Sequence, residues 1–280
     1  MELHYYAIDG SGRDVVRLVP LGDIHWGVMN CAEGLLLEWV DRIRADRDCW
    51  WVGMGDMLEA INFTDRRFDP RVIAARYRVM DLRDLPMLQA RELVGVLGSI
   101  ADRCIGWHTG NHEETILLRY HEDVTGWMCT ELGLVGDNLG GRYLENNAMT
   151  VLEVRRRGRR TLRYRIYSEH GRGSGRTAGG SLNSLLRLSS NFDADIYLRG
   201  HVHQRMAVVQ PRLRVEYEPR RRAGRLRLED WDQVFCLTGT FYRTYLEGST
   251  SYAEQRSYAP TPLGPLVVTI DVDTGRLSVI

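Results

Sequence analysis

The chain of 280 residues has no lysine, so all 37 of its basic residues are arginine. Aspartate and glutamate together also number 37, and the formal net charge is therefore zero. A zero net charge argues against a protein whose whole surface binds nucleic acid. A GC-rich genome is the simplest reason for the missing lysine, although the planar guanidinium of arginine also suits phosphate oxygens.

The chain also lacks long apolar runs and paired cysteines. No stretch is long and apolar enough to span a membrane, and the first residues, "MELHYYAIDG", do not resemble a secretory signal. The five cysteines are an odd number, lie far apart and form no Cys-x-x-Cys pair. We therefore predict a cytoplasmic protein with reduced thiols, most of them in the core, and no membrane partner.

Short apolar runs and helical patterns alternate over the first 115 residues. Residues 15–22 and 49–56 read as buried strands that end in polar residues, and residues 35–47 carry a helical apolar stripe. The second half is rich in strands, with hairpin turns near Gly158 and near the C-terminus. This order predicts an α/β fold in which residues 1–280 form a single domain with two packed sheets.

A long insertion, residues 57–103, separates the second predicted strand from the third. A helical pattern covers residues 70–103 and is interrupted near Pro86. We interpret this helical insertion as a cap over a site, and a contact between subunits is the alternative. The sequence does not decide the oligomeric state.

Five segments share one property, since each follows an apolar run and ends in side chains that can bind metal. They are "LGDIHWG" (21–27), "GMGDMLE" (53–59), "TGNHEE" (109–114), "YSEHGRG" (167–173) and "LRGHVHQ" (198–204). In an open α/β sheet, ligands gather at the carboxyl ends of the strands, so these segments are expected to converge. Glycine precedes Asp23, Asp56, Asn111 and His201, and we expect it to allow a sharp turn at each place.

The candidate metal ligands are carboxylates, imidazoles and one amide, without a thiolate. They are Asp23, His25, Asp56, Asn111, His170, His201 and His203. This set suits Mn²⁺, Fe or Zn²⁺ better than a soft metal. Seven ligands are too many for one ion, but they suit two ions about 3.5–4 Å apart that share a carboxylate, as in enzymes that attack phosphate esters. We predict two divalent ions, with Mn first and Fe, Zn, Ni or Mg as alternatives.

The order of these segments resembles the calcineurin-like metallophosphoesterase family, in a form similar to its bacterial and phage members. The shared motifs are Gly-Asp-x-His, Gly-Asp, Gly-Asn-His-Glu, a single His and Gly-His-x-His, and they span residues 22–203, about two thirds of the chain. The resemblance implies a four-layer α/β/β/α sandwich with the metals at the edge of the central sheets.

The resemblance also implies a role for each matching residue. The first metal would be held by Asp23, His25 and His203, the second by Asn111, His170 and His201, and Asp56 would bridge the two. A hydroxide between the ions would attack phosphorus, and its formation near neutral pH follows from the two cations. His112 would bind the phosphate and protonate the leaving oxygen as a general acid.

Residues 59 and 60 need separate treatment. In the Ser/Thr phosphatase branch of the family, the place of Glu59 holds an Asp that orients the catalytic His, and we hypothesise that Glu59 orients His112. The next place holds a phosphate-binding Arg in that branch, whereas this chain has Ala60. The departure weakens the interpretation as a protein phosphatase.

The sequence leaves two interpretations open for several nearby side chains. Arg172 and Arg176 follow His170 in a Gly- and Ser-rich segment, where they would clamp phosphate oxygens or lie solvated on a loop. Glu113 is a partner of a metal-bound His or a simple acid at a helix N-terminus. Trp26 would stack on a base or shield the site. We expect His108, which precedes the loop, to be structural.

These observations favour a phosphodiesterase whose substrate is nucleic acid or a nucleotide, with DNA or RNA as the expected partner. The missing phosphatase Arg supports this interpretation, as do two arginine-rich segments, "RRRGRR" (155–160) and "PRRRAGRLR" (219–227). A phosphomonoesterase or a nucleotide pyrophosphatase is the alternative enzyme. A non-catalytic scaffold is a more remote alternative, because every ligand position and His112 are intact.

Overall fold

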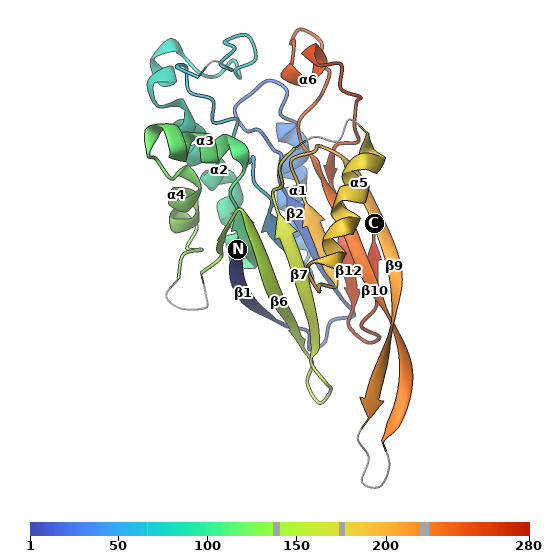
Figure 1. Ribbon diagram of the computed structural model, residues 1–280. Helices are drawn as coiled ribbons and strands as arrows, with labels where there is room; N and C mark the ends of the chain where they lie inside the picture. Colours follow the sequence, from blue (N-terminus) through green and yellow to red (C-terminus); the bar gives the residue numbers. More distant parts are fainter. Residues whose placement is uncertain (66, 137–140, 174–176, 219–223) are drawn as a thin grey trace.

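The computed structural model describes residues 1–65, 67–136, 141–173, 177–218 and 224–280 (Figure 1). These residues form two mixed sheets and several helices, so the predicted α/β class is confirmed. Arg176 lies outside the described residues. No helix among the described residues is long and apolar enough to cross a membrane.

The larger sheet has the strand order β1-β6-β7-β8-β10-β11, and β9 pairs with β10. Its strands are β1 (Glu2–Asp9), β6 (Asn147–Arg155), β7 (Leu162–Glu169), β8 (Ile196–Arg199), β9 (Arg205–Glu218), β10 (Arg225–Thr240) and β11 (Gly264–Pro265). The smaller sheet has the order β13-β12-β2-β3-β4-β5. Its strands are β2 (Val15–Leu21), β3 (Cys49–Gly53), β4 (Cys104–His108), β5 (Tyr143–Glu145), β12 (Val268–Asp271) and β13 (Leu277–Val279).

The helices connect these strands and cover the sheets. They are α1 (Glu33–Ala45), α2 (Leu85–Leu97), α3 (Asn111–Tyr120), α4 (Val124–Glu131), α5 (Ala178–Arg187) and α6 (Tyr252–Gln255), with 3₁₀ turns η1 (Val79–Asp84), η2 (Gly98–Arg103) and η4 (Leu188–Ser190). The parallel strands β2, β3 and β4 lie in the middle of the smaller sheet. Their continuous apolar runs fit strands that are buried on both faces.

Three hydrophobic clusters show how the sheets and helices pack. Side chains of the two sheets meet in one cluster, which contains Val52 of β3 and Ile166 of β7. The neighbouring Trp51 points to the other face of β3, as strand alternation requires, and packs in a cluster with residues of α1 and α2. A third cluster lies between α5 and the larger sheet, where Leu185 accompanies Phe235. Figure 1 shows α5 on the opposite side of the molecule from α2.

The insertion is less helical than predicted. The described residues between 57 and 78 contain no helix, and helical structure begins only at η1. Pro86 does not interrupt a helix but lies in the first turn of α2, where its missing N–H would have no partner in any case. Leu93 and Leu97 of α2 pack in the core against the smaller sheet. Residues 85–103 are therefore the helical part of the connection between β3 and β4. The cap that we predicted for residues 57–103 stays a prediction, as does the alternative of a contact between subunits.

Candidate metal centre

The loops that follow β2, β3, β4, β7 and β8 bring the candidate ligands together. Asp23 shows how closely these loops are tied to one another. Its amide donates to the carbonyl of Gly55, at 2.9 Å, and its carboxylate accepts the amide of His201 at 2.9 Å. Its own carbonyl accepts the hydroxyl of Thr240 at 2.8 Å. Asp23 thereby joins the loops after β2, β3 and β8 to the end of β10.

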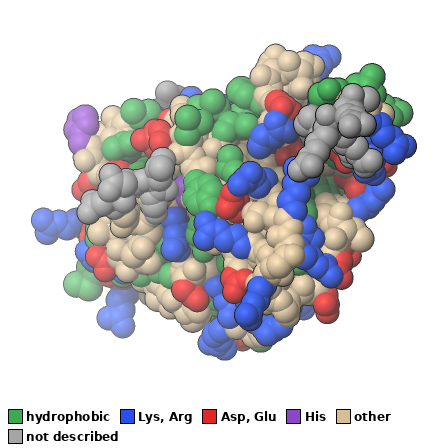
Figure 2. All heavy atoms as spheres, turned by 90° about the horizontal axis from the view of Figure 1, so that it is seen from below, with side chains coloured by type: hydrophobic (Ala, Val, Ile, Leu, Met, Phe, Trp, Pro, Cys, Tyr) green, Lys and Arg blue, Asp and Glu red, His purple; other side chains and the backbone are tan. Residues whose placement is uncertain are grey.

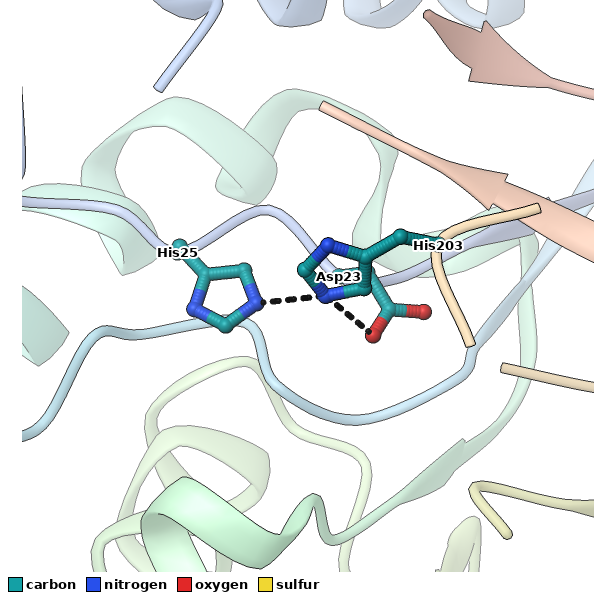
Figure 3. A group of neighbouring side chains, drawn as sticks. All are labelled: Asp23, His25 and His203. Atoms are coloured by element: carbon teal, nitrogen blue, oxygen red, sulfur yellow. Dashed lines mark hydrogen bonds and ion pairs between the residues drawn. The ribbon is translucent and has the colours of Figure 1, made fainter. Parts of the chain in front are cut away.

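A first group consists of Asp23, His25 and His203, whose candidate ligand atoms all lie within 4.8 Å of one another. The Nε2 atom of His203 lies 3.1 Å from Nε2 of His25 and 3.3 Å from a carboxylate oxygen of Asp23 (Figure 3). Two imidazole nitrogens and a carboxylate oxygen therefore point at one place. Nitrogen lone pairs at this separation repel each other unless a proton or a cation lies between them.

A second group consists of Asp56, His170 and His201, with the amide of Asn111 beside it. The Nδ1–H of His170 donates to the carbonyl of Met54 at 2.7 Å, which leaves Nε2 to face the site. That nitrogen lies 3.1 Å from Oδ1 of Asn111 and 3.3 Å from Oδ2 of Asp56. In the neutral ring, all three atoms are electron-pair donors, so their convergence fits a cation.

The carboxylates around the second group favour a positive charge at this place. Burial alone would lower the pKa of His170, but the negative charges of Asp56 and Asp23 and the hydrogen bond to Asp56 raise the pKa to about 10. Nδ1 of His201 is buried and has no hydrogen-bond partner among the residues that the structure describes.

Comparison with protein-family models and with curated proteins finds no match. The case for a metal centre depends on this geometry, in which buried His and Asp groups could hold metal ions.

The backbone conformation of the candidate ligands is unusual. Positive φ angles occur at Asp23 (47°), His25 (52°), Asp56 (47°), His201 (68°) and His203 (53°). Non-glycine residues rarely adopt this conformation, and each instance costs on the order of 1–3 kcal/mol. Such conformations persist where the surrounding structure enforces them, and they concentrate at functional sites.

Gly110 has a different purpose here from the one we predicted. The backbone of Gly110 is extended, with φ of −90°, so this residue needs no left-handed freedom. A Cβ at this position would instead lie 1.9 Å from the amide nitrogen of Asp56. Gly55 does have a positive φ of 82°, and a Cβ there would lie 2.7 Å from Gly110. These glycines let the loops after β3 and β4 touch.

His112 lies beside both groups at the start of α3. Its amide donates to Oδ1 of Asp56 at 2.9 Å, and its Nδ1–H donates to the backbone carbonyl of Glu59 at 2.6 Å. Burial lowers the pKa of His112, but the charges of Asp56 and Glu59 more than offset this and raise the pKa above its usual value. The ring is thus fixed with Nε2 as its remaining reactive nitrogen.

Glu59 is placed differently from our hypothesis. Its carboxylate accepts the Nδ1–H of His25 at 2.9 Å, whereas the same oxygen lies 4.0 Å from Nδ1 of His112. Burial raises the pKa of Glu59, but the neighbouring His112 and His25 lower it below its usual value, so the carboxylate is ionised. The backbone carbonyl of Glu59 orients His112, and its carboxylate orients the candidate ligand His25.

The contact between Glu59 and His25 leads to a prediction about metal affinity. In Glu59→Gln, the amide oxygen still accepts from His25 but the negative charge is lost, so Mn²⁺ affinity should fall about 10- to 100-fold. Calorimetric titration with Mn²⁺ measures the change. Glu114→Gln is the control, because Glu114 lies on the same helix as His112 but pairs with Arg172. Equal affinities in wild type and Glu59→Gln would contradict the assigned role.

Glu113 joins the two central loops. Its carboxylate accepts the amide of Leu58 at 2.9 Å and the amide of Gly110 at 3.1 Å, which makes it the acid of a capping arrangement at the start of α3. Of our two readings, the geometry matches the helix N-terminal acid. Burial and the negative charge of Asp56 raise the pKa of Glu113 to about 7.

The other candidate side chains lie at the edge of the site or away from it. Arg172 is exposed and pairs with Glu114, its Nη2 lying 2.6 Å from Oε1. Trp26 is buried, donates its Nε1–H to Glu92 at 2.9 Å, and is covered by Arg76, so it has no face free for a base. Tyr242 was not anticipated, since no motif contains it. Its ring centroid lies 5.0 Å from that of His25.

His108 is a fully buried structural residue at the end of β4. Its Nδ1–H donates to the carbonyl of Glu145 at 3.1 Å, and its Nε2 accepts the hydroxyl of Ser168 at 2.8 Å. Burial lowers the pKa of His108 to about 3. Because the folded-state pKa is lowered, the contribution of His108 to stability is complete above the unfolded pKa of 6.5 and is lost as the pH falls toward 3.

The pH dependence of stability tests this account of His108. Below about pH 6, the free energy of unfolding should fall by about 1.4 kcal/mol more per pH unit in wild type than in His108→Gln. Urea denaturation at several pH values measures both slopes. Glutamine retains a donor and an acceptor but does not titrate, so parallel slopes in the two proteins would contradict the prediction.

Proposed function

We propose that the chain is a phosphoesterase that uses two divalent ions and belongs with the calcineurin-like metallophosphoesterases. The observation that carries the proposal is the pair of adjacent ligand groups, one around His203 and one around His170, each with a buried aspartate. The three hydrophobic clusters support the four-layer α/β/β/α order. One lies between the helices α1 and α2 and the smaller sheet, one between the two sheets, and one between the larger sheet and α5.

The first ion would be held by Asp23, His25 and His203, and the second by Asn111, His170 and His201, with Asp56 between them. When bound, two divalent ions supply Lewis acidity for a phosphate ester and for the water that attacks it. Mn²⁺ is the first candidate, with Fe, Zn, Ni and Mg as alternatives, because the donors are oxygen and imidazole nitrogen. His25 is held for this task by Glu59, and His170 by the carbonyl of Met54.

His112 would donate the proton that the leaving oxygen requires. Its Nδ1–H is fixed on the carbonyl of Glu59, so the proton on Nε2 is the one available for transfer. The neighbouring charges of Asp56 and Glu59 raise the pKa of His112 and favour the protonated ring. The carboxylate of Asp56 also fixes the His112 amide, which couples the acid to the metal ligands.

A phosphodiester of nucleic acid or a nucleotide is the proposed substrate. A monoester carries an extra negative charge that cations must hold, and this chain has the buried Ala60 where a phosphate-binding arginine would lie in phosphatases. The amide of Ala60 donates to the side-chain oxygen of Gln89. The guanidinium of Arg172 is paired with the carboxylate of Glu114, so its charge is already partly neutralised before a phosphate could bind. A phosphomonoesterase or nucleotide pyrophosphatase is the alternative, and a binding scaffold the remote one.

Hydrolysis of two model esters distinguishes these functions. We expect the Mn²⁺-loaded protein to cleave bis-p-nitrophenyl phosphate faster than p-nitrophenyl phosphate, and EDTA to stop both reactions. Cleavage of the monoester alone would support the alternative enzyme. Absence of cleavage with Mn, Fe, Zn, Ni or Mg would contradict the proposal and favour a scaffold. Labelled single- and double-stranded DNA and RNA then identify the substrate.

A further inference from the structure

The hairpin of β9 and β10 extends far beyond the rest of the larger sheet (Figure 1). β10 pairs with β8 only over residues 234–237. Its pairing with β9 continues beyond this part, as far as Arg225 opposite Glu218. We call residues 210–218 and 225–233 the arm. Within the described residues, the arm is a two-stranded ribbon, and an isolated two-stranded ribbon is at best marginally stable in water.

One face of the arm is apolar and exposed. Directly opposed residues of an antiparallel pair lie on the same face, and the register sets Leu226 against Tyr217 and Leu228 against Val215. The apolar stripe consists of residues that are 61 to 70% exposed, namely Leu213, Val215, Tyr217, Leu226 and Leu228. Figure 2, a view from below, shows hydrophobic side chains together with several arginines at the end of the molecule where the hairpin lies.

Two carboxylates next to the stripe share one arginine partner. Asp230 lies opposite Leu213 on the stripe face, and Asp232 follows two residues later. Arg276 pairs with both, its guanidinium nitrogens lying 3.3 Å and 3.7 Å from their carboxylate oxygens. The exposed Arg212, Arg225 and Arg227 alternate with the stripe residues and therefore lie on the other face of the ribbon. The described part of the stripe face is thus apolar and carries no arginine of the arm, which favours an apolar occupant over the phosphates of a nucleic acid.

We propose that this face of the arm is a dimer interface, covered by the same face of a second copy of the chain. The stripe extends over both strands, so a two-fold axis can set it against itself. At roughly 100 Å² of exposed surface per side chain, two stripes would bury about 1,000 Å², which is the size at which a specific interface begins. The zero net charge of the chain removes long-range repulsion between copies.

The arm also leaves the candidate metal centre free. Its tip lies at the opposite end of the molecule from the carboxyl end of β7, which leads to His170 (Figure 1). Association through the arm therefore keeps both centres of a dimer open. The interface does not depend on the proposed enzymatic function, and metal binding should be the same in monomer and dimer.

Sedimentation velocity and light scattering over a concentration series test the interface. Wild type should reach twice the chain mass of 32.2 kDa, whereas Leu228→Glu should remain at the single mass. The matched control is Val79→Glu, since Val79 is 86% exposed on η1, away from the arm, and this variant should dimerise like wild type. Circular dichroism and Mn²⁺ titration show that each variant is folded.

A more conservative substitution tests the interface without disrupting the fold of the arm. Val215→Thr keeps the shape and the strand preference of valine but adds a hydroxyl to the stripe, so it should raise the dimer dissociation constant about tenfold. A wild-type chain that stays monomeric throughout the series overturns the proposal and leaves the stripe to a partner of another kind. A dimer that survives intact in both stripe variants overturns it as well.

Discussion

Asp56→Asn is expected to lower turnover of a phosphodiester by roughly 10²–10³-fold, the usual effect of removing one group from a preorganised electrostatic site. Asp56 is almost fully buried, and one of its oxygens lies 3.3 Å from Nε2 of His170 while the other accepts the amide of His112 at 2.9 Å. Asparagine keeps the shape and an acceptor oxygen for His112. The substitution therefore removes the charge between the two ligand groups and leaves the fold in place.

Metal content should fall together with activity in this variant. Elemental analysis after reconstitution with Mn²⁺ measures the number of bound ions per chain, and hydrolysis of bis-p-nitrophenyl phosphate measures turnover. Asp195→Asn is the matched control, because Asp195 is a partly buried carboxylate that accepts the amide of Arg165 at the amino end of β8. An Asp56→Asn protein with wild-type metal content and turnover would refute the assignment of this residue.

The positions of the candidate ligands could be predicted from the sequence for a simple reason. Each follows an apolar run, and parallel strands present their carboxyl ends at one edge of a sheet. The predicted hairpin near Gly158 is likewise present between β6 and β7. The five cysteines are free and buried, as expected from their spacing.

The partners of individual side chains could not be predicted in this way. The carboxylate of Glu59 lies 2.9 Å from Nδ1 of His25 and 4.0 Å from Nδ1 of His112. Which of the two it binds depends on a difference of about an ångström, which sequence patterns do not determine. The sequence also suggested that glycine supplies turns, whereas Gly110 is required because the loop after β3 passes against it. Close approaches between segments that are distant in sequence leave no periodic signal.

The sequence patterns also did not predict that the arm extends beyond the rest of the sheet. Alternation of apolar and charged residues predicts a strand with one apolar face, but it does not say whether that face is covered. Residues 213–217 alternate in this way, and the structure leaves Leu213, Val215 and Tyr217 exposed, in the part of the ribbon that lies beyond the residues of β10 paired with β8. An exposed apolar face on a regular strand is therefore a feature that only tertiary structure can show.

His112→Asn is expected to lower turnover by about 10²–10⁴-fold, the usual contribution of a general acid, while metal content stays at the wild-type level. The side-chain amide of asparagine can still donate to the carbonyl of Glu59, so the loop after β3 keeps its contact. The loss should depend on the leaving group. It should be small for bis-p-nitrophenyl phosphate, whose leaving phenolate needs little protonation, and large for a dinucleotide, whose leaving alkoxide needs a proton.

This dependence on the leaving group separates a general acid from a residue that only supports the fold. His121→Asn is the control, because His121 is exposed at the other end of α3 with a φ of 60°, a conformation that asparagine tolerates, and its activity should be unchanged. Equal losses of His112→Asn toward both esters would assign His112 to substrate binding instead. Loss of metal together with activity would make it a positioning residue for the ligand groups, since its amide is bonded to Asp56.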